Sequence, residues 1–225
     1  MGVSTAALMA TIPTRPMNKF ERIRLVRHLG INTEDSVLVE SRADLDKHSH
    51  FLAGLNRCSV RTFPRASAGH SKPHFPIVTR AEFQSSCVPL LDQGYSLIVA
   101  KPIDPTDATL AGRIVRRPSD FLVEVALGPG TTRRVTHEGR IDQTLELSGP
   151  DDPRCGPEIA RALSELAKAE KRWADQIQLT DVLYEFSAYR HPVGWKHEPI
   201  IFWEIHGLEG QDAKLDRFYR EVAAS

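Results

Sequence analysis

The stretch VLYEFSAYRHPVGWKHEPIIFWEIHG, residues 182–207, decides the fold class of this 225-residue chain. Two apolar, aromatic-rich runs, VLYEFSAY and PIIFWEIHG, flank the polar segment RHPVGWKHE. Short runs of this composition favour β-strands, and a short polar connection between two strands is typical of antiparallel neighbours. The end of the chain therefore predicts strands paired with each other, which belongs to an α+β fold.

The rest of the chain alternates irregularly between helix and strand signals. Helices are expected at 18–30, 43–55, 79–94, 157–177 and 212–225, the first capped by Asn18 with Glu21 and the third by Thr79 with Glu82. Strands are expected at 35–41, at 57–64, over most of 94–104, and within 120–130 up to a Gly-Pro-Gly turn. A loop is expected at 65–76, part loop and part short strand at 104–120, and a hairpin at 131–147 that turns at Glu138–Gly139. This order predicts an α+β fold with mixed or antiparallel sheets, and no dinucleotide or P-loop fingerprint is present.

Composition sets the domain organisation. Residues 1–17 are expected to form a disordered tail, and residues 18–225 a single two-lobed α+β domain, with sub-lobes 18–150 and 151–225 divided at the linker GPDDPRCGP. Lys and Arg total 29 and Asp and Glu total 29, so the chain lacks the basic excess of a general duplex-binding protein. Three separated cysteines and the lack of a membrane-length apolar run predict a cytoplasmic protein.

Two cations follow β-type runs and precede loops. Arg61 lies in SVRTF and Lys101 in IVAKP, where two prolines at 102 and 105 stiffen the exit. A strand end holds a charge more rigidly than a loop does, so this pair predicts a phosphate-binding role. The alternative is that both are solvated strand ends.

Three glutamates interrupt apolar strands: Glu124 in FLVEVALG, Glu185 in VLYEFSAY and Glu204 in IIFWEIHG. A carboxylate in such a run is costly to bury unless it is paired or used. Glu185 and Glu204 on neighbouring strands could hold Mg²⁺, which prefers carboxylate and phosphate oxygens. The alternative is that all three lie at sheet edges or in salt bridges.

Other charged and aromatic groups give weaker signals. Arginines cluster around a predicted hairpin and form either a phosphate lip or a solvated rim; they are Arg113, Arg116, Arg117, Arg133, Arg134 and Arg140. The nine histidines lack zinc-site spacing. The aromatic residues of 184–203 are expected to build the core under the last two strands rather than a base-stacking platform.

The order of SVRT, IVAKP, FLVEVALGPGTTRRV, YEFSAYRHPVG and FWEIHG resembles the ATP-grasp fold. SVRTF is also similar to the Arg-Ser-Ser stretch in the nucleotide-binding domain of phosphoenolpyruvate synthase and pyruvate phosphate dikinase. The resemblance implies that Arg61 and Lys101 contact phosphates, together with a hairpin arginine such as Arg133. It places Glu124, Val125 and Ala126 at the adenine hinge. Glu185 and Glu204 would then be the Mg²⁺ ligands.

The function that follows is binding of ATP and Mg²⁺, with phosphate transfer or ligation of a carboxylate to an amine, and with an unidentified small-molecule second substrate. The alternative is a non-catalytic module that binds RNA or a protein through the arginines of the Arg113–Arg140 hairpin. A third possibility is a domain that kept the fold and lost the chemistry.

Overall fold

The computed structural model describes residues 17–65, 73–103, 107–128, 130–131, 135, 139–190, 199–208 and 210–224. Of the predicted disordered tail, residues 1–16 lie outside this range. Met17 lies inside it and is buried in the main hydrophobic core. None of the helices in the described part of the chain combines the length and apolar character that a bilayer crossing requires.

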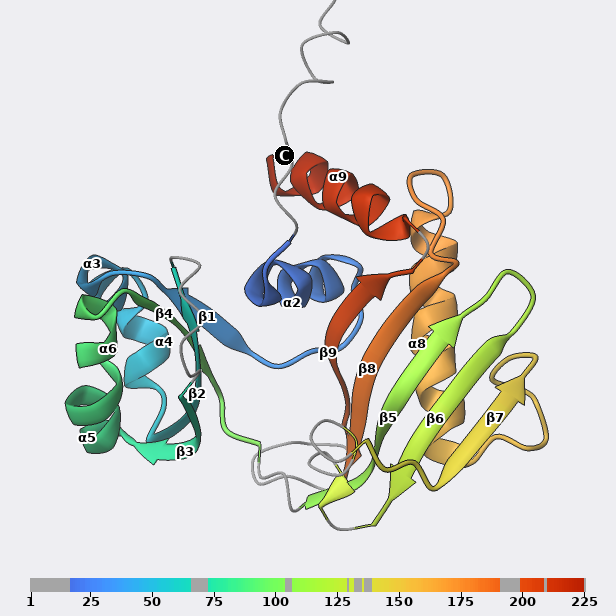
Figure 1. Cartoon of the computed structure of the whole chain (residues 1–225), viewed down its shortest axis with the longest axis horizontal. Coiled ribbons are helices and arrows are strands. Elements are labelled where there is room, and N and C mark those ends of the chain that lie inside the picture. Colours follow the sequence, from blue (N-terminus) through green and yellow to red (C-terminus); the bar gives the residue numbers. More distant parts are fainter. Residues whose placement is uncertain are drawn as a thin grey trace, which may run out of the picture.

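The strands form two separate antiparallel sheets, seen side by side in Figure 1. The small sheet has the order β1 (Ser36–Val39), β4 (Tyr95–Ala100), β2 (Arg57–Pro64) and β3 (His74–Thr79). The large sheet has the order β7 (Gln143–Leu147), β6 (Phe121–Leu127), β5 (Ala108–Arg116), β8 (Val182–Tyr189) and β9 (Ile200–Gly207). The α+β class predicted from the sequence is confirmed. The predicted sub-lobe boundary at residue 150 does not coincide with the division between the sheets, because β7 and β8 belong to one sheet.

Short helices cover the outer face of the small sheet. They are α3 (Arg42–Lys47), α4 (Ser49–Ala53), α5 (Arg80–Glu82), the π-helical turn η1 (Phe83–Cys87) and α6 (Pro89–Asp92). Val60, Leu97 and Val99 fill this side with Phe83 and Cys87. The predicted helix at 79–94 is thus broken before Pro89, as expected. A proline inside a helix removes its own hydrogen bond, and its ring clashes with the carbonyl four residues earlier. Just before Pro89 the turn is widened, and the Val88 N–H donates to Phe83 O, five residues earlier, at 3.0 Å.

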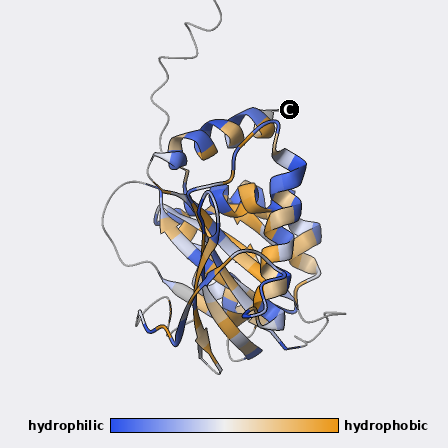
Figure 2. Ribbon diagram, turned by 90° about the vertical axis from the view of Figure 1, so that its right-hand side faces the viewer, coloured by the Kyte–Doolittle hydropathy of each residue, from blue (hydrophilic) through white to orange (hydrophobic). Residues whose placement is uncertain are grey.

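Helices also cover one face of the large sheet. Helix α8 (Pro157–Trp173) lies behind it in Figure 1, and its apolar stripe joins the same core as the inward side chains of β5, β6 and β8. Figure 2 shows apolar residues gathered where helices meet this sheet. Helix α2 (Lys19–His28) packs on β9 and against α9 (Gln211–Ala224); its Arg22 donates to Ile205 O at 2.8 Å and to Asp212. The capping box of Asn18 with Glu21 is confirmed.

The segment between α2 and β1 runs along the outer edge of β9. The Phe202 N–H donates to Asn32 O at 2.9 Å, and the Asn32 side chain donates to Ile200 O at 2.6 Å. The Thr33 hydroxyl donates to Phe202 O at 2.7 Å. These bonds fix residues 32–33 against the last strand of the large sheet.

Three predicted elements differ from the structure. The predicted hairpin at 131–147 is wrong. Thr131 and Val135 are helical, and Val135 is buried against Ala111 and Ala126; among the described residues of this segment, the strand is Gln143–Leu147. The predicted loop at 65–76 is partly wrong because His74–Thr79 pairs with β2. The predicted helix at 43–55 is split into α3 and α4 at His48.

The turn that links β7 to α8 is organised by Asp152. Its carboxylate accepts from the Ser148 N–H and from both the side chain and the backbone of Arg154, with distances of 2.8 to 3.1 Å. The Arg154 side chain, and then the backbone N–H groups of Arg154 and Ser148, lower the pKa of Asp152 far below its ordinary value of 3.8. A lowered pKa stabilises the fold above that ordinary value and loses this contribution as pH falls below it.

We therefore expect Asp152→Asn to weaken the acid dependence of stability. The urea midpoint of the native chain should fall more steeply below pH 3.8 than the midpoint of the variant. Parallel urea titrations from pH 6 to about pH 2 measure this difference. Identical slopes for the two proteins would contradict the assignment.

Candidate functional site

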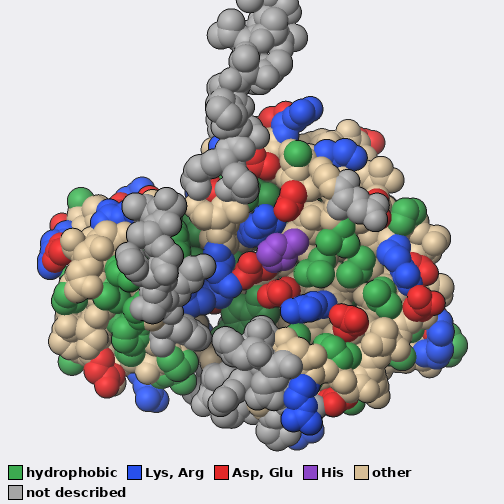
Figure 3. All heavy atoms as spheres, in the orientation of Figure 1, with side chains coloured by type: hydrophobic (Ala, Val, Ile, Leu, Met, Phe, Trp, Pro, Cys, Tyr) green, Lys and Arg blue, Asp and Glu red, His purple; other side chains and the backbone are tan. Residues whose placement is uncertain are grey.

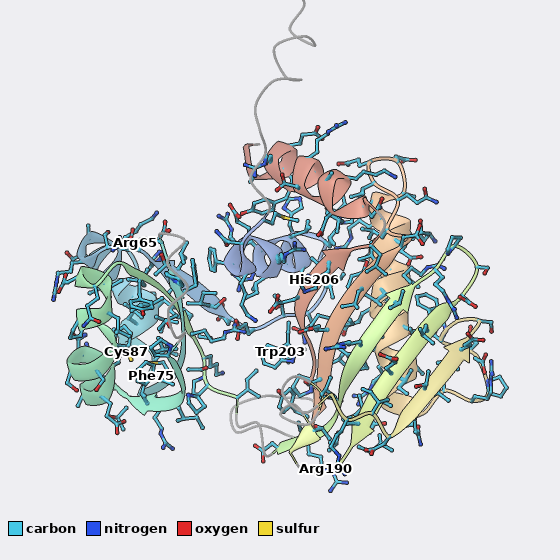
Figure 4. All side chains as sticks on the ribbon, viewed as in Figure 1. Arg65, Phe75, Cys87, Arg190, Trp203 and His206 are labelled. Atoms are coloured by element: carbon cyan, nitrogen blue, oxygen red, sulfur yellow. The ribbon has the colours of Figure 1, made fainter. Side chains whose placement is uncertain are left out.

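A β-bulge in β9 sets the direction of the side chains on the open face of the large sheet. Glu204 lies opposite Glu185, but Phe202 lies opposite Phe186, so β9 holds one residue more than β8 between these pairs. A bulge of this kind turns two consecutive side chains to one face. Trp203 accordingly donates from Nε1 to Ser187 Oγ at 2.9 Å, on the same face as Glu185 and Glu204. Figure 4 shows Trp203 and His206 along β9, in the region between the two sheets.

A row of charged side chains crosses this face. Residues directly opposite in an antiparallel pair share a face, and the register places Glu124, Arg113, Glu185 and Glu204 in one line across β6, β5, β8 and β9. Arg113 Nε lies 3.9 Å from Glu185 Oε1. The prediction that Glu185 and Glu204 lie on neighbouring strands is confirmed, and the register places them directly opposite each other on one face of the sheet.

Glu204 is the most enclosed acid of this row. It is 8% exposed, its Oε1 forms an ion pair with Lys19 of α2, and its Oε2 lies 3.4 Å from His206 Nε2. Burial alone would raise the pKa of Glu204. The contacts with His206 and Lys19 outweigh burial and lower the pKa to about 2, so the group is a carboxylate at neutral pH.

Arg61 links the two sheets. It extends from β2 of the small sheet, forms an ion pair with Glu34 of the segment before β1, and places its guanidinium 5.8 Å from the ring centroid of Trp203. Its side chain is 18% exposed and that of Glu34 is 4% exposed. Burial lowers the pKa of Arg61 to about 10, although the negative charge of Glu204 opposes this. The guanidinium therefore stays charged and lies near Glu204.

Lys101 lies directly after β4, half-buried, with its backbone N–H bonded to Asp35 O at 3.0 Å. Arg61 lies opposite Ile98 on the neighbouring strand. Lys101 is three residues beyond Ile98, a distance of about 10 Å along the strand. Arg61 and Lys101, the two predicted phosphate contacts, thus lie on or directly after adjacent strands of the small sheet. Of the two, Arg61 is the one placed near Trp203 and Glu204.

The predicted adenine hinge lies farther away. Glu124 lies on β6, three strands from Glu204, which corresponds to about 14 Å across the sheet. Val125 is buried on the helix-covered face, and Ala126 is buried with Ala111 and Val135. The Val125 carbonyl accepts a hydrogen bond from the Asp142 N–H at 2.9 Å. Arg133 lies outside the described residues.

The arginines around β5 do not form one surface. Arg113 lies on the open face beside Glu185, whereas Arg116 reaches Glu170 of α8 at 2.8 Å on the helix-covered side. Arg117 pairs with Asp120 and Glu146 at the end of the β5–β6 hairpin. Arg134, like Arg133, lies outside the described residues. A basic RNA- or protein-binding surface built on these arginines is not supported.

Figure 3 shows cationic and acidic side chains, with a histidine, gathered where the surface is hollowed between the two sheets. The sequence did not predict Lys19, Glu34, Trp203 or His206 as members of this group. Lys19 and Glu34 come from outside the sheets, and no local pattern indicates where their side chains lie. Strict alternation along β9 would put Trp203 and Glu204 on opposite faces. The bulge that puts them on one face cannot be read from the sequence.

Glu185 and Glu204 provide some, but not all, of the oxygen ligands that a magnesium ion requires. Two opposed carboxylates, Glu185 and Glu204, supply the oxygens that Mg²⁺ prefers when phosphate oxygens and water complete its shell. Among the described residues, no group of three or more His, Cys, Asp or Glu side chains is arranged to hold a metal by itself. The two carboxylates would supply two ligands of a metal ion, and water or phosphate oxygens would supply the others.

No protein-family model matches the chain, and no curated protein matches its sequence. Solved structures resemble its fold. N5-carboxyaminoimidazole synthetase from Staphylococcus aureus, complexed with ADP, gives a TM-score of 0.47 at 12% identity over 83% of this chain and 43% of that one. D-alanine-D-alanine ligase from Helicobacter pylori gives 0.45 at 14% identity over 92% and 60%. The ATP-grasp ligase PsnB, complexed with a minimal precursor, gives 0.40 at 10% identity over 90% and 58%.

The chain spans about half the length of these structures. The resemblance to phosphoenolpyruvate synthase and pyruvate phosphate dikinase stays a prediction.

Proposed function

We propose that this chain binds ATP with Mg²⁺ between its two sheets and acts as an ATP-grasp-type ligase that joins a carboxylate to an amine. In that reaction a carboxylate oxygen attacks the γ-phosphorus of ATP and ADP leaves. The amine then displaces phosphate from the activated carboxyl group. The second substrate is a small molecule whose identity the proposal leaves open, and simple phosphate transfer to an acceptor is the variant of the same chemistry.

One observation carries the proposal. Glu185 and Glu204 lie opposite each other on the open face of the large sheet. The guanidinium of Arg61, from the small sheet, lies over the ring of Trp203 on that same face. Paired carboxylates and a fixed guanidinium are the groups that a metal-bound triphosphate requires. They come from two sheets with no strand in common, so a ligand bound there would contact both.

Each residue has a role in this proposal. Glu185 and Glu204 would hold Mg²⁺, which screens the phosphate charges and orients the γ-phosphate when bound. Arg61 and Lys101 would neutralise phosphate oxygens from the small-sheet side, as would Arg133. Glu124, with the adjoining Val125 and Ala126, would lie on the adenine side of the site.

Thermal unfolding with ATP and Mg²⁺ tests the proposal. A ligand at about 100 times its dissociation constant stabilises a protein by about 2.7 kcal/mol, which for a chain of this size raises the melting temperature by about 5 °C or more. We expect this rise with ATP and Mg²⁺ together and a smaller one with ATP and EDTA. Glu185→Gln should remove most of the Mg²⁺-dependent part.

Glu146→Gln is the matched control, because Glu146 is an exposed acid of β7 in the same sheet. It should keep the full rise. An unchanged melting temperature of the native chain at millimolar ATP and Mg²⁺ would argue against nucleotide binding. A full rise that survives Glu185→Gln would indicate that the metal role of this residue is absent or lost.

A further inference from the structure

Each of the two opposed carboxylates already has a cation of the protein beside it. The Lys19 ammonium pairs with Oε1 of Glu204, and Arg113 Nε lies 3.9 Å from Glu185. The two cations come from different elements, α2 and β5. The charges of Glu185 and Glu204 are therefore balanced within the folded chain.

This balance has a physical cause. Like charges directly opposite each other on neighbouring strands destabilise a sheet, and an enclosed carboxylate without a partner is costly. Glu204 faces both difficulties, since it lies opposite Glu185 and is 8% exposed. His206 contacts only its Oε2. Lys19 supplies the remaining charge at Oε1, which is an oxygen that a metal ion would also need.

The two partners differ in how firmly they are held. The Lys19 side chain is 44% exposed, whereas the Glu204 side chain is 10% exposed and belongs to the β9 bulge. A lysine ammonium on a flexible stem can leave for water at small cost. Phe20 and Ile23, next to Lys19 on α2, are buried against Ile98, so the helix stays in place when the ammonium moves. Lys19 is thus the displaceable partner.

We propose that Lys19 is a built-in competitor for the divalent cation at Glu204: its ammonium occupies the carboxylate in the metal-free chain and must leave when the metal binds. This inference rests on the proposed function in one respect, the assignment of Glu204 as a metal ligand. It adds that helix α2, which packs on β9 from outside both sheets, sets how tightly the site takes its metal.

Mn²⁺ binding without nucleotide tests the competition. Free Mn²⁺ is measured by electron paramagnetic resonance while MnCl₂ is added to the native chain and to Lys19→Met, which keeps the side-chain length and removes the charge. Removing this partly exposed cation beside the carboxylate should tighten Mn²⁺ binding by about three- to fivefold. Lys19→Arg should bind Mn²⁺ as weakly as the native chain does.

Two further variants separate this effect from a general change of charge. Lys214→Met removes an exposed lysine of α9 and should leave Mn²⁺ affinity unchanged. Glu204→Gln, alone or combined with Lys19→Met, should abolish the binding. Thermal unfolding verifies that each variant is folded, and Lys19→Gln replaces Lys19→Met if the methionine variant is not.

The outcomes are distinguishable. The native chain and the folded Lys19 variant could bind Mn²⁺ equally tightly, with Glu204→Gln abolishing binding in both. That result would overturn the competition and leave Glu204 as a metal ligand. No Mn²⁺ binding by either protein would overturn the competition and the metal assignment together. Tighter binding in Lys19→Met that survives Glu204→Gln would also overturn it, because the cation would then bind elsewhere.

Discussion

Glu34→Gln is expected to destabilise the folded chain by about 3 kcal/mol, because it leaves a buried guanidinium without its counter-charge. Glu34 and Arg61 are both largely enclosed, with side chains 4% and 18% exposed. The substitution keeps the size of the Glu34 side chain, so the loss reports charge rather than packing. Urea unfolding at neutral pH measures it as a lower midpoint with an unchanged slope.

An exposed ion pair provides the control. Arg42 of α3 and Asp92 of α6 pair beside the small sheet, with 2.8 Å between Nη2 and Oδ2 and both side chains well exposed. Asp92→Asn should therefore change the urea midpoint little, since exposed pairs contribute little to stability. A small loss for Glu34→Gln, similar to that for Asp92→Asn, would show that the Arg61 charge is hydrated or is compensated by Glu204 alone.

Gly112→Ala is expected to destabilise the chain by about 3 kcal/mol, the upper range for overpacking a core. Gly112 lies in the central strand β5, opposite Val125 and Phe186. A Cβ placed there would lie 2.1 Å from the backbone oxygen of Glu124 and 2.8 Å from Cγ1 of Val125. The backbone of β6 would have to move, and with it the row of charged side chains that begins at Glu124.

Gly149→Ala is the matched control, because a Cβ at Gly149 has no neighbour within 4 Å and the backbone there needs no left-handed angle. Its unfolding free energy should change by less than about 0.5 kcal/mol. Equal effects of the two substitutions in urea unfolding would contradict the close approach of β5 and β6.

Local signals predicted most of the elements. The capping boxes at Asn18 and Thr79 are confirmed, and β2 has the predicted bounds of 57–64. The errors come from tertiary packing. At 131–147 a turn signal at Glu138–Gly139 suggested a hairpin, but Val135 is helical and packs against Ala111 and Ala126. Periodicity within a segment does not reveal which surface that segment will cover.

Of the candidate site, the sequence could predict only the residues whose positions depend on the pairing of consecutive strands. Glu185 and Glu204 could be paired because each interrupts an apolar strand and the strands are consecutive. The aromatic prediction held for Tyr184 and Phe202, which are buried in the core, whereas Trp203 lies on the other face of the sheet. The counter-ions Lys19 and Glu34 depend on packing between distant segments, which spacing along one strand cannot indicate.

The bonds from Asn32 and Thr33 to β9 have a consequence for association between molecules. An unpaired outer strand is a template on which another chain can add a strand, and such addition leads to aggregation. Here the Phe202 N–H and the carbonyls of Ile200 and Phe202 are already occupied by residues 32–33. The strand that carries Glu204 is thereby closed to edge-to-edge pairing, and a second copy of the chain cannot extend the large sheet there.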